Sequence, residues 1–591
     1  MKNFFSRVFS TIVGNLLTFA ILFAFLTVLI LVSSIGSGTK NTIVPKAAIL
    51  ELTLDSPIME SEMDRTPLTL FNLSEEHTSY YLSDILDAIE AAATDDRIQG
   101  ISLKVDNFQG GFTQADDIRL ALENFKKSGK FVYAFSNNSS QISYYIMSIA
   151  DKIYQNPLGM SMVQGLSAEI MFYKNFGDKY GIDFQVIRHG AYKSAVEPYL
   201  RDNLSEENKE QIINYVGDIW NNIATKTAKS RQLSLEQFNT KVDSLYAFNP
   251  DLAKKNKLVD ELSQESAYNL MLIKKIDETV ENVNEKTEKK YFTNLEDYIL
   301  QLNKKKGKDV IAVLYASGGI SEGDGFEGIQ SETYIKAIQD IAENDKIKAV
   351  VLRINSPGGS ANASEAILYE LKQLRKKKPV VVSFGDVAAS GGYYIAQSSE
   401  RIFANANTIT GSIGVLGMIP NAKKLANNIG ITTDIVKTNA NADQLKSWTN
   451  PMNDYTEITI QRSIEYIYHQ FVNRIVENRN MTFEAVDKVG GGRVWSGSRA
   501  MQHGLVDEIG SLQDAINYTA KLINADRYKL ESYPKRKQAF EEFMESLGGK
   551  TTKEALAQEL GSEGYALYEQ VKNIQNQRGA QLRLPFTMKI K

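Results

Sequence analysis

The sequence predicts an α/β protein made of two tandem copies of one unit, preceded by an N-terminal transmembrane helix. Three observations predict this architecture. Residues 101–193 overlay residues 350–442 without a gap when they are shifted by 249 positions. In both copies, apolar runs of strand length alternate with amphipathic segments of helix length. Ahead of both copies, residues 11–35 are almost wholly apolar, which is long enough for a bilayer span.

The repeat is supported by identical residues at matching positions along its length. These pairs include Gly110/Gly359, Ile118/Ile367, Phe135/Phe384, Tyr144/Tyr393, Asn156/Asn405, Gly165/Gly414 and Gly181/Gly430. Two positions differ in a way that bears on chemistry. Ser390 of the second copy faces Gln141 of the first, and Lys193 of the first copy faces Ala442 of the second. Each copy therefore carries one half of a Ser/Lys pair, as expected if one site is assembled from both.

The expected elements follow the same order in the two copies. In the first copy we expect strands at 47–54, 100–105 and 130–135 and a helix at 115–127; in the second, strands at 310–316, 349–354 and 379–384 and a helix at 363–377. Alternating β and α units of this length indicate a mixed α/β fold, with right-handed crossovers wherever paired strands run parallel.

Changes in composition divide the chain into five segments. We expect an anchor and tether at 1–46, a first repeat carrying the lysine at 47–263, a charged and helix-prone linker at 264–308, a second repeat carrying the serine at 309–525, and a charged helical tail at 526–591. The last residues of the tail, 582–591, turn apolar and strand-like.

The apolar segment 11–35 predicts a single membrane span. About 22 helical residues at 1.5 Å each reach roughly 33 Å, enough for a hydrocarbon core of about 30 Å. Lys2 and Arg7 precede the segment, so we expect the start of the chain in the cytoplasm and everything after it exported. A cleaved signal peptide remains the alternative, because small residues follow the apolar run.

Composition excludes several classes of function. A net charge of −4 and a pI near 5.9 give no reason to expect nucleic acid as a partner. The chain contains no cysteine, which excludes disulfides, cysteine-based zinc sites and thiol nucleophiles. Its four histidines are not paired at metal-binding spacing, and the sequence has no Walker-type loop. We therefore expect neither a metal nor a cofactor.

A Pro-Gly-Gly turn follows an expected strand of the second copy. Gly358 and Gly359 place backbone N–H groups at the strand end, where glycine permits close approach. Together with the N–H of Gly391, such groups can hold the oxyanion of an acyl-transfer intermediate. A plain tight turn is the alternative interpretation.

Ser390 follows the next strand and opens a helix through Gly391. A nucleophile at this place gains from the positive end of the helix dipole and from nearby N–H groups. The alternative is an ordinary N-cap serine.

Lys193 is the candidate general base. To act near pH 7 it must be neutral, so its pKa must fall from about 10.4 to roughly 7–8, which takes about 3–4 kcal/mol of desolvation. Ala191 and Val196 beside it permit burial. A solvated surface lysine is the ordinary alternative, and His189 is a rival base four residues away.

Several long motifs occur in an order that resembles the SppA-type signal peptide peptidases of protease family S49, in their long, internally duplicated form. The motifs are residues 356–359 (SPGG), 386–394 (DVAASGGYY), 410–414 (TGSIG), 190–195 (GAYKSA), 492–497 (GRVWSG) and 504–507 (GLVD). The resemblance implies a ClpP/crotonase-like fold for each repeat, with Ser390 as nucleophile and Lys193 as general base. It implies that Ser412 orients the lysine ammonium, although Ser412 could also be an ordinary turn hydroxyl.

The same resemblance implies biological context. It predicts a serine endopeptidase with a Ser/Lys dyad that hydrolyses remnant signal peptides and other hydrophobic peptides. It places a homotetramer in the bacterial inner membrane, held by residues 11–35, with its catalytic part on the periplasmic side. Two other classes stay open: a crotonase-like acyl-CoA enzyme, which could use the same oxyanion turn, and a catalytically inactive membrane scaffold.

Overall fold

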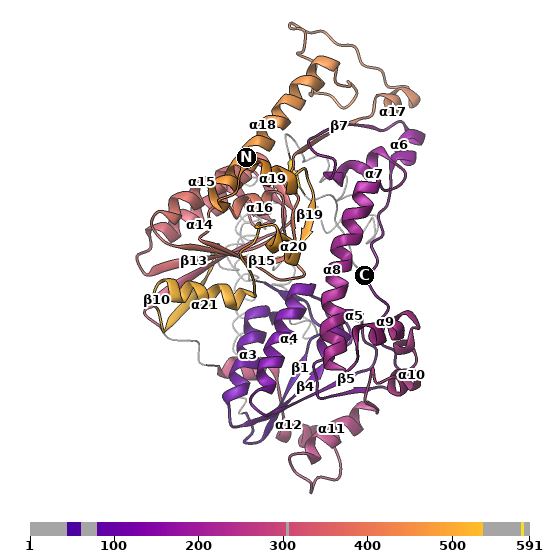
Figure 1. Cartoon of the computed structure of the whole chain (residues 1–591), viewed down its shortest axis with the longest axis vertical. Coiled ribbons are helices and arrows are strands. Elements are labelled where there is room, and N and C mark those ends of the chain that lie inside the picture. Colours follow the sequence, from indigo (N-terminus) through magenta and orange to yellow (C-terminus); the bar gives the residue numbers. More distant parts are fainter. Residues whose placement is uncertain (1–43, 61–79, 303–306, 536–580, 584–591) are drawn as a thin grey trace, which may run out of the picture.

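The computed structural model describes residues 44–60, 80–302, 307–535 and 581–583. These residues form two α/β lobes, one from each repeat. An arm that contains residues 174–188 and 416–453 extends beyond both lobes (Figure 1). The predicted membrane span at 11–35 lies outside the described residues. Among the residues that are described, no helix combines the length and apolar character needed to cross a bilayer.

The first lobe is built on a parallel six-stranded sheet. Its strands, in spatial order, are β8 (Glu261–Leu262), β6 (Lys152–Gln155), β5 (Phe131–Ser136), β4 (Ile98–Lys104), β1 (Ala48–Thr53) and β9 (Phe292–Asn294). The central strands are mostly buried because helices cover both faces of the sheet, as is usual for parallel sheets. β9 comes from the expected linker and closes one edge of this sheet.

The second lobe repeats this plan. Its main sheet runs β19 (Val494–Ser496), β17 (Ile409–Gly411), β15 (Val380–Ala389), β13 (Ile347–Ser356), β10 (Asp309–Ser317) and β21 (Tyr528–Tyr533), with β16 (Arg401–Ala404) beside β15 and β20 (Glu508–Ile509) beside β16. β21 comes from the expected tail and pairs in parallel with β10, so this part of the tail is strand and not helix.

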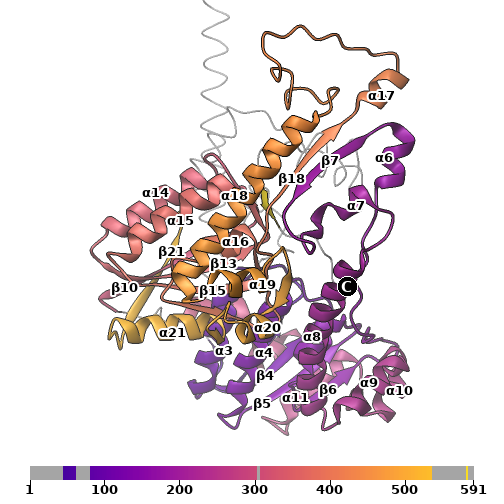
Figure 2. The ribbon, with the colours of Figure 1, turned by 45° about the horizontal axis from the view of Figure 1, so that its top comes forward.

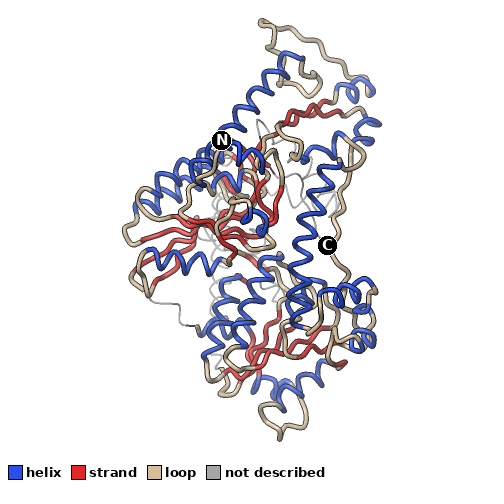
Figure 3. The backbone as a smooth tube through the Cα atoms, viewed as in Figure 1, coloured by secondary structure: helices blue, strands red, loops and turns tan. Residues whose placement is uncertain are grey.

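Helices surround both sheets (Figure 3). In the first repeat they are α3 (Leu82–Thr94), α4 (Phe112–Lys126), α5 (Gln141–Met147), α6 (Lys174–Tyr180), α7 (Glu197–Leu200), α8 (Glu206–Ser230), α9 (Leu235–Asp243) and α10 (Pro250–Lys255), with the 3₁₀ turns η2 (Ser194–Val196) and η3 (Tyr246–Phe248); in the linker they are α11 (Glu265–Lys274), α12 (Glu285–Tyr291) and α13 (Leu295–Gln301). In the second repeat they are α14 (Ser331–Glu343), α15 (Ala361–Arg375), α16 (Gly391–Ile395), α17 (Lys423–Asn428), α18 (Asp454–Arg479), α19 (Phe483–Val489), α20 (Gly497–Gln502) and α21 (Leu512–Leu522). α3 and α14 connect the first two long strands of each repeat, and neither was expected from the sequence.

The two repeats match in register as well as in plan. α4 and α15 begin 249 positions apart at Phe112 and Ala361, and they end 249 positions apart as well. α6 and α17 also begin at equivalent positions, Lys174 and Lys423. Beyond these helices the repeats diverge: α6 leads into β7 (Asp183–Arg188), whereas residues 432–437 after α17 are exposed and form no strand.

A third sheet contains strands of both repeats. Two of them, β7 and β18 (Leu416–Asn421), run side by side along the arm (Figure 2). The order of this sheet is β12 (Ile329–Gln330), β11 (Ile320–Ser321), β14 (Gly358–Ser360), β22 (Gln581–Arg583), β18 and β7. β7 pairs with β18 antiparallel over six residues, which joins the first repeat to the second. A two-stranded sheet of β2 (Ile58–Met59) and β3 (Tyr80–Tyr81) completes the strand inventory of the described residues.

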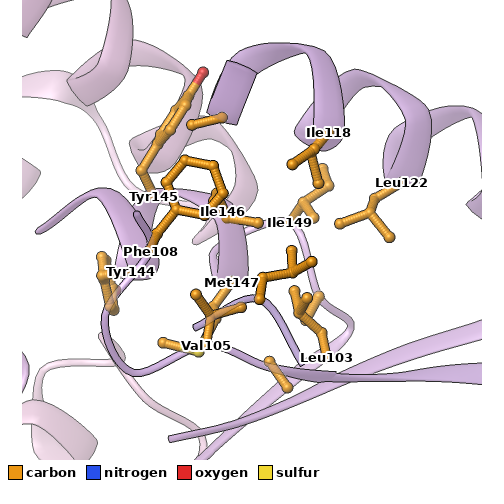
Figure 4. Packing of buried hydrophobic residues seen from close by; sticks show 14 of the residues in the cluster. Leu103, Val105, Phe108, Ile118, Leu122, Tyr144, Tyr145, Ile146, Met147 and Ile149 are labelled. Atoms are coloured by element: carbon orange, nitrogen blue, oxygen red, sulfur yellow. The ribbon is translucent and has the colours of Figure 1, made fainter. Parts of the chain in front are cut away.

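Each lobe has its own apolar core. In the first, helices α4 and α5 pack on β4 through side chains such as Ile118, Leu122 and Ile146 (Figure 4). The lobes also share buried polar contacts. The guanidinium of Arg353 in β13 donates to both carboxylate oxygens of Glu60 at 3.0 Å, with both side chains almost fully buried. These contacts fix the second repeat against the first.

Candidate active site

Ser390 lies at the turn between β15 and α16 in a strained conformation. Its φ of 55° and ψ of −116° are unusual for a residue with a side chain and are of the kind found at functional sites. Neighbouring hydrogen bonds hold this turn: Ser390 N donates to Gly411 O at 2.8 Å, and Ser390 O accepts from Tyr394 N at 2.8 Å. Ser390 occupies the N-cap position of α16, but its hydroxyl makes no capping hydrogen bond, so capping is not what this side chain does.

Lys193 extends from the loop between β7 and η2 of the first repeat to Ser390 of the second. Its Nζ lies 2.9 Å from Ser390 Oγ and 3.0 Å from both the carbonyl oxygen and the Oγ of Ser412. All three residues have a relative exposure of 0%. The structure thus brings together the lysine, the serine and the second serine that the sequence singled out, and Lys193 is not a surface residue.

Burial determines the electrostatics of this contact. Desolvation lowers the pKa of Lys193 well below its ordinary value, because the ammonium form loses its hydration. No carboxylate is among the causes of this shift, and the partners of Nζ are neutral oxygens. The site therefore favours the neutral amine, which is the form that can accept a proton.

Glycines allow the lysine loop, residues 189–193, to approach the second repeat closely, because they have no side chain that would collide with it. A Cβ on Gly492, whose φ is +85°, would lie 2.5 Å from Lys193 N, and a Cβ on Gly414 would lie 3.2 Å from Lys193 Cδ. Gly190 would clash in the same way with Gly491. This role of residues 490–492 was not expected from the sequence, although a run of three glycines was a signal for such an approach.

Gln211 on α8 supports the same loop and was not anticipated. Its Nε2 donates to Ser194 Oγ at 2.8 Å and to Tyr192 O at 3.2 Å, on either side of Lys193. Its Oε1 accepts from Val494 N at 3.1 Å. One side chain therefore connects the lysine loop to β19 of the second repeat, and nothing in the sequence distinguished it.

The Pro-Gly-Gly turn lies next to Ser390 as the sequence predicted. A Cβ on Gly391 would be 3.1 Å from both Gly358 Cα and Gly359 N, so the three predicted oxyanion residues are neighbours. A Cβ on Gly359 would lie only 1.9 Å from Ile320 O, which explains the glycine there. Gly358 N donates to Ser356 Oγ at 3.1 Å, so this N–H already has a partner within the turn.

The rival base, His189, does not take the place of Lys193. Its Nδ1 lies 2.6 Å from Glu465 Oε2, and its ring stacks on Tyr468 with 3.6 Å between centroids. These contacts hold the imidazole against α18, and the group that contacts Ser390 is the amine of Lys193.

The first repeat has no equivalent serine. Gln141 occupies the matching position, and its Oε1 accepts hydrogen bonds from the N–H groups of Gln164 at 3.0 Å and Gly165 at 2.8 Å. The side chain that replaces the nucleophile thus bonds to the loop equivalent to the one that carries Gly414. Across the described ranges, no group of three or more potential ligands is arranged to hold a metal ion.

Comparison with known proteins gives matches along both repeats. The profile of Peptidase family S49 matches residues 124–276 and 372–526, and that of Clp protease matches residues 303–412. The first S49 segment contains Lys193 and the second contains Ser390. These matches support the expected α/β fold with ClpP-like repeats.

Full-length relatives are also similar. The chain is 35% identical to Protease 4 of Salmonella typhi over 531 residues, which cover 87% of this chain and 84% of that protein. It is 34% identical to Protease 4 of Haemophilus influenzae, covering 87% of this chain and 85% of the relative. It is 31% identical to a chloroplastic serine protease, SPPA, of Arabidopsis thaliana, covering 80% of this chain and 69% of the relative.

Proposed function

Since the chain belongs to peptidase family S49 and is a serine peptidase, we propose that it is a membrane-anchored endopeptidase whose nucleophile is Ser390 and whose general base is Lys193. The observation that carries this assignment is the 2.9 Å contact between Lys193 Nζ and Ser390 Oγ, with both side chains fully buried. The proposed substrates are remnant signal peptides and other hydrophobic peptides.

The first half of the reaction forms an acyl-enzyme. Neutral Lys193 takes the hydroxyl proton while Ser390 Oγ forms a bond to the carbonyl carbon of the scissile peptide. The C–N bond then breaks, and Lys193 gives the proton to the leaving amine. In the second half, Lys193 accepts a proton from water as the water oxygen attacks the ester, and it returns that proton to Ser390 Oγ.

Backbone N–H groups stabilise the oxyanion that forms in both halves. We assign this role to Gly359 and Gly391, because the N–H of Gly358 is directed to Ser356 Oγ. Gly358 then shapes the turn with its positive φ of 95°. Donors of this kind are worth about 3–4 kcal/mol of transition-state stabilisation each.

Ser412 positions the amine. Its Oγ and its carbonyl oxygen both lie 3.0 Å from Nζ, so an amine that donates two protons to Ser412 directs its lone pair at Ser390 Oγ. This supports the orienting role that the family resemblance implied.

Membrane attachment rests on the sequence. The apolar segment 11–35 supports a single span, and Lys2 and Arg7 before it support a cytoplasmic N-terminus. We propose that the catalytic part is exported and faces the periplasm in the bacterial inner membrane. Fractionation of cells expressing the full chain, followed by protease digestion of spheroplasts, tests this: protection of the catalytic part in intact spheroplasts would contradict it.

Self-association is supported by the mismatch between the repeats. β7 follows α6 and pairs with β18, but the equivalent segment 432–437 after α17 is exposed, with Val436 fully so. By the repeat offset of 249 positions, residues 432–437 correspond to β7 and residues 167–172 correspond to β18. The equivalent contact would therefore pair residues 432–437 of one copy with residues 167–172 of a second copy. We propose that repetition of this contact closes a ring, which the family resemblance implies to be a tetramer.

Mass measurement in detergent tests the ring. Val436→Asp places a charge in the proposed contact and should convert the assembly to smaller species, whereas Leu158→Asp, at another exposed apolar residue, should not. An assembly of unchanged mass in Val436→Asp would contradict the proposed contact.

A serine-directed acylating probe tests the catalytic assignment. We expect covalent modification of Ser390, found by peptide mapping, and loss of labelling and of peptide hydrolysis in both Ser390→Ala and Lys193→Ala. His189→Asn should retain both. Hydrolysis that survives Ser390→Ala would refute the assignment, and acyl-CoA turnover without a Ser390 adduct would favour the crotonase-like alternative.

A further inference from the structure

The strand that carries the nucleophile is bound to the first repeat at Asp386, four residues before Ser390. Asp386 belongs to β15, and its Oδ1 accepts a hydrogen bond of 2.8 Å from the backbone N–H of Thr113 at the start of α4. Its Oδ2 lies against Gly111, where a Cβ would overlap the carboxylate. The carboxylate therefore reaches across the boundary between the repeats to the first turn of a helix.

The turn that binds Asp386 is the counterpart of the proposed oxyanion turn. At the offset of 249 positions, residues 110–112 of the first repeat correspond to residues 359–361 of the second, and α4 and α15 begin at equivalent positions. A helix N-terminus suits a negative group, because its free N–H groups and the helix dipole both favour negative charge there. In the second repeat we assign this place to a transient oxyanion; in the first repeat it binds a permanent carboxylate.

Other contacts hold β15 on both sides of Asp386. Arg353 of the neighbouring strand β13 donates to the carbonyl oxygen of Phe384 at 2.6 Å. Ala389 is fully buried in the apolar core of the first lobe. Asp386 lies between these points and adds a directional hydrogen bond. Ser390 follows directly, and its strained φ of 55° persists only where the surroundings fix the backbone.

We propose that Asp386 is a positioning residue for the nucleophile: its carboxylate, bound at the start of α4, fixes the end of β15 so that Ser390 Oγ stays within reach of Lys193 Nζ. The lysine comes from the first repeat and the serine from the second, so a relative movement of the repeats would change their 2.9 Å contact. The bond between β15 and α4 opposes that movement close to the site. The inference rests on the proposed function, because it concerns the reaction of Ser390.

The bond to Thr113 requires an acceptor oxygen, and a neutral oxygen can serve. Burial raises the pKa of Asp386, and the N–H of Thr113 opposes this shift. Because burial disfavours the charged form, a neutral side chain of the same shape should replace the carboxylate. Asparagine keeps an oxygen that can accept from Thr113, whereas alanine does not. Asp386→Asn is therefore the conservative variant, and Asp386→Ala is the disruptive one.

Steady-state kinetics of full-length variants test the proposal. Asp386→Ala should lower kcat for an apolar fluorogenic peptide about 10- to 100-fold with KM nearly unchanged, because a displacement of about 1 Å costs that much in rate. The rate at which a serine-directed acylating probe labels Ser390 should fall by the same factor. Asp386→Asn should stay within about threefold of the wild-type kcat.

Asp151→Ala is the matched control. Asp151 also accepts a hydrogen bond from a backbone N–H, that of Val132 at 2.9 Å, and Val132 lies on β5, the equivalent of β15 in the first repeat. Because β5 leads to no nucleophile, Asp151→Ala should leave kcat and the labelling rate unchanged.

Gly111→Ala gives a second test that leaves Asp386 in place. Gly111 has a φ of −87° and a ψ of 173°, which alanine adopts without strain, and the atoms nearest to the added methyl all belong to Asp386. The methyl should therefore act by displacing the carboxylate. We expect kcat to fall about tenfold in the wild-type background, and less than about twofold further in the Asp386→Ala background, where the carboxylate is gone.

Three results would overturn the inference: a wild-type kcat in Asp386→Ala, an Asp386→Asn enzyme as slow as Asp386→Ala, or equal losses from Gly111→Ala in both backgrounds. If Asp386→Ala does not fold, Gly111→Ala alone decides, and a wild-type kcat in that variant would overturn the inference. Hydrolysis that survives Ser390→Ala would instead contradict the proposed function, so the two failures are distinguishable.

Discussion

Replacing Lys193 by methionine tests the central contact between the repeats. Methionine fills a similar volume in this fully buried place but cannot accept a proton from Ser390 Oγ, which lies 2.9 Å from Nζ in the wild type. General-base catalysis contributes about 10²–10⁴-fold, equivalent to roughly 3–5 kcal/mol of transition-state stabilisation. We therefore expect kcat for an apolar fluorogenic peptide to fall by that factor, with KM nearly unchanged.

Arginine at the same position separates basicity from hydrogen bonding. Lys193→Arg retains donors toward Ser412, but its guanidinium stays protonated and cannot act as a base. It should be as inactive as Lys193→Met. In the wild type, kcat/KM should rise with pH as Lys193 loses its proton, and the lowered pKa of this amine brings that rise below the range of an ordinary lysine.

Stability gives an independent measurement. Because the folded-state pKa of Lys193 is lowered, the folded chain binds fewer protons than the unfolded chain between that pKa and about 10.5, so this residue makes the free energy of unfolding increase with pH in that window. Lys193→Met should remove this contribution. A Lys193→Met enzyme within about threefold of wild-type kcat, or a pH dependence of the rate that disappears in His189→Asn, would refute the reasoning.

Three further predictions concern the surroundings of the site. Gly492→Ala would place a Cβ 2.5 Å from Lys193 N. The resulting shift of the lysine should lower kcat by about 10²-fold with little change in KM. Gly430 has a similar φ of +82° but lies in open space, so Gly430→Ala is the control and should leave kcat unchanged. Arg353→Met removes the guanidinium that neutralises the buried carboxylate of Glu60 and should lower the free energy of unfolding by about 3–5 kcal/mol in urea titrations. The double variant with Glu60→Gln should recover much of the loss, and additive losses would contradict the pairing. Burial raises the pKa of Asp117 to about 8, so between about pH 4 and pH 8 the folded chain binds a proton that the unfolded chain has lost. The free energy of unfolding should therefore decrease as pH rises through this range. Asp117→Asn should flatten that slope in unfolding curves recorded across the same range.

Local sequence patterns determined the main strands and helices of each repeat. The expected strands at 100–105 and 349–354 lie within or overlap β4 and β13, and the expected helices at 115–127 and 363–377 overlap α4 and α15. Apolar periodicity is a property of neighbouring residues, so it could be read directly. The asymmetry of Ser390 and Lys193 between the repeats also required only an alignment of the chain with itself.

The contacts between distant segments could not be read in this way. Gln211 looks like any polar residue of a long helix, and its role arises only because α8 passes between the lysine loop and β19. The pairing of Arg353 with Glu60 joins residues 293 positions apart. The strand-like character of 582–591 was visible in the sequence and overlaps β22, but the sheet that this strand joins was not. That third sheet combines strands from both repeats and from the tail.

The sequence by itself determined that two α/β repeats follow an apolar N-terminal segment, and that each repeat holds one member of a Ser/Lys pair. Only the tertiary structure decided that these members, 197 positions apart, lie in contact and out of water, and that the C-terminal strand lies beside them. The physical reason is that strand and helix formation depend on local periodicity, whereas the pKa of a lysine and the occupant of a sheet edge depend on how distant segments pack.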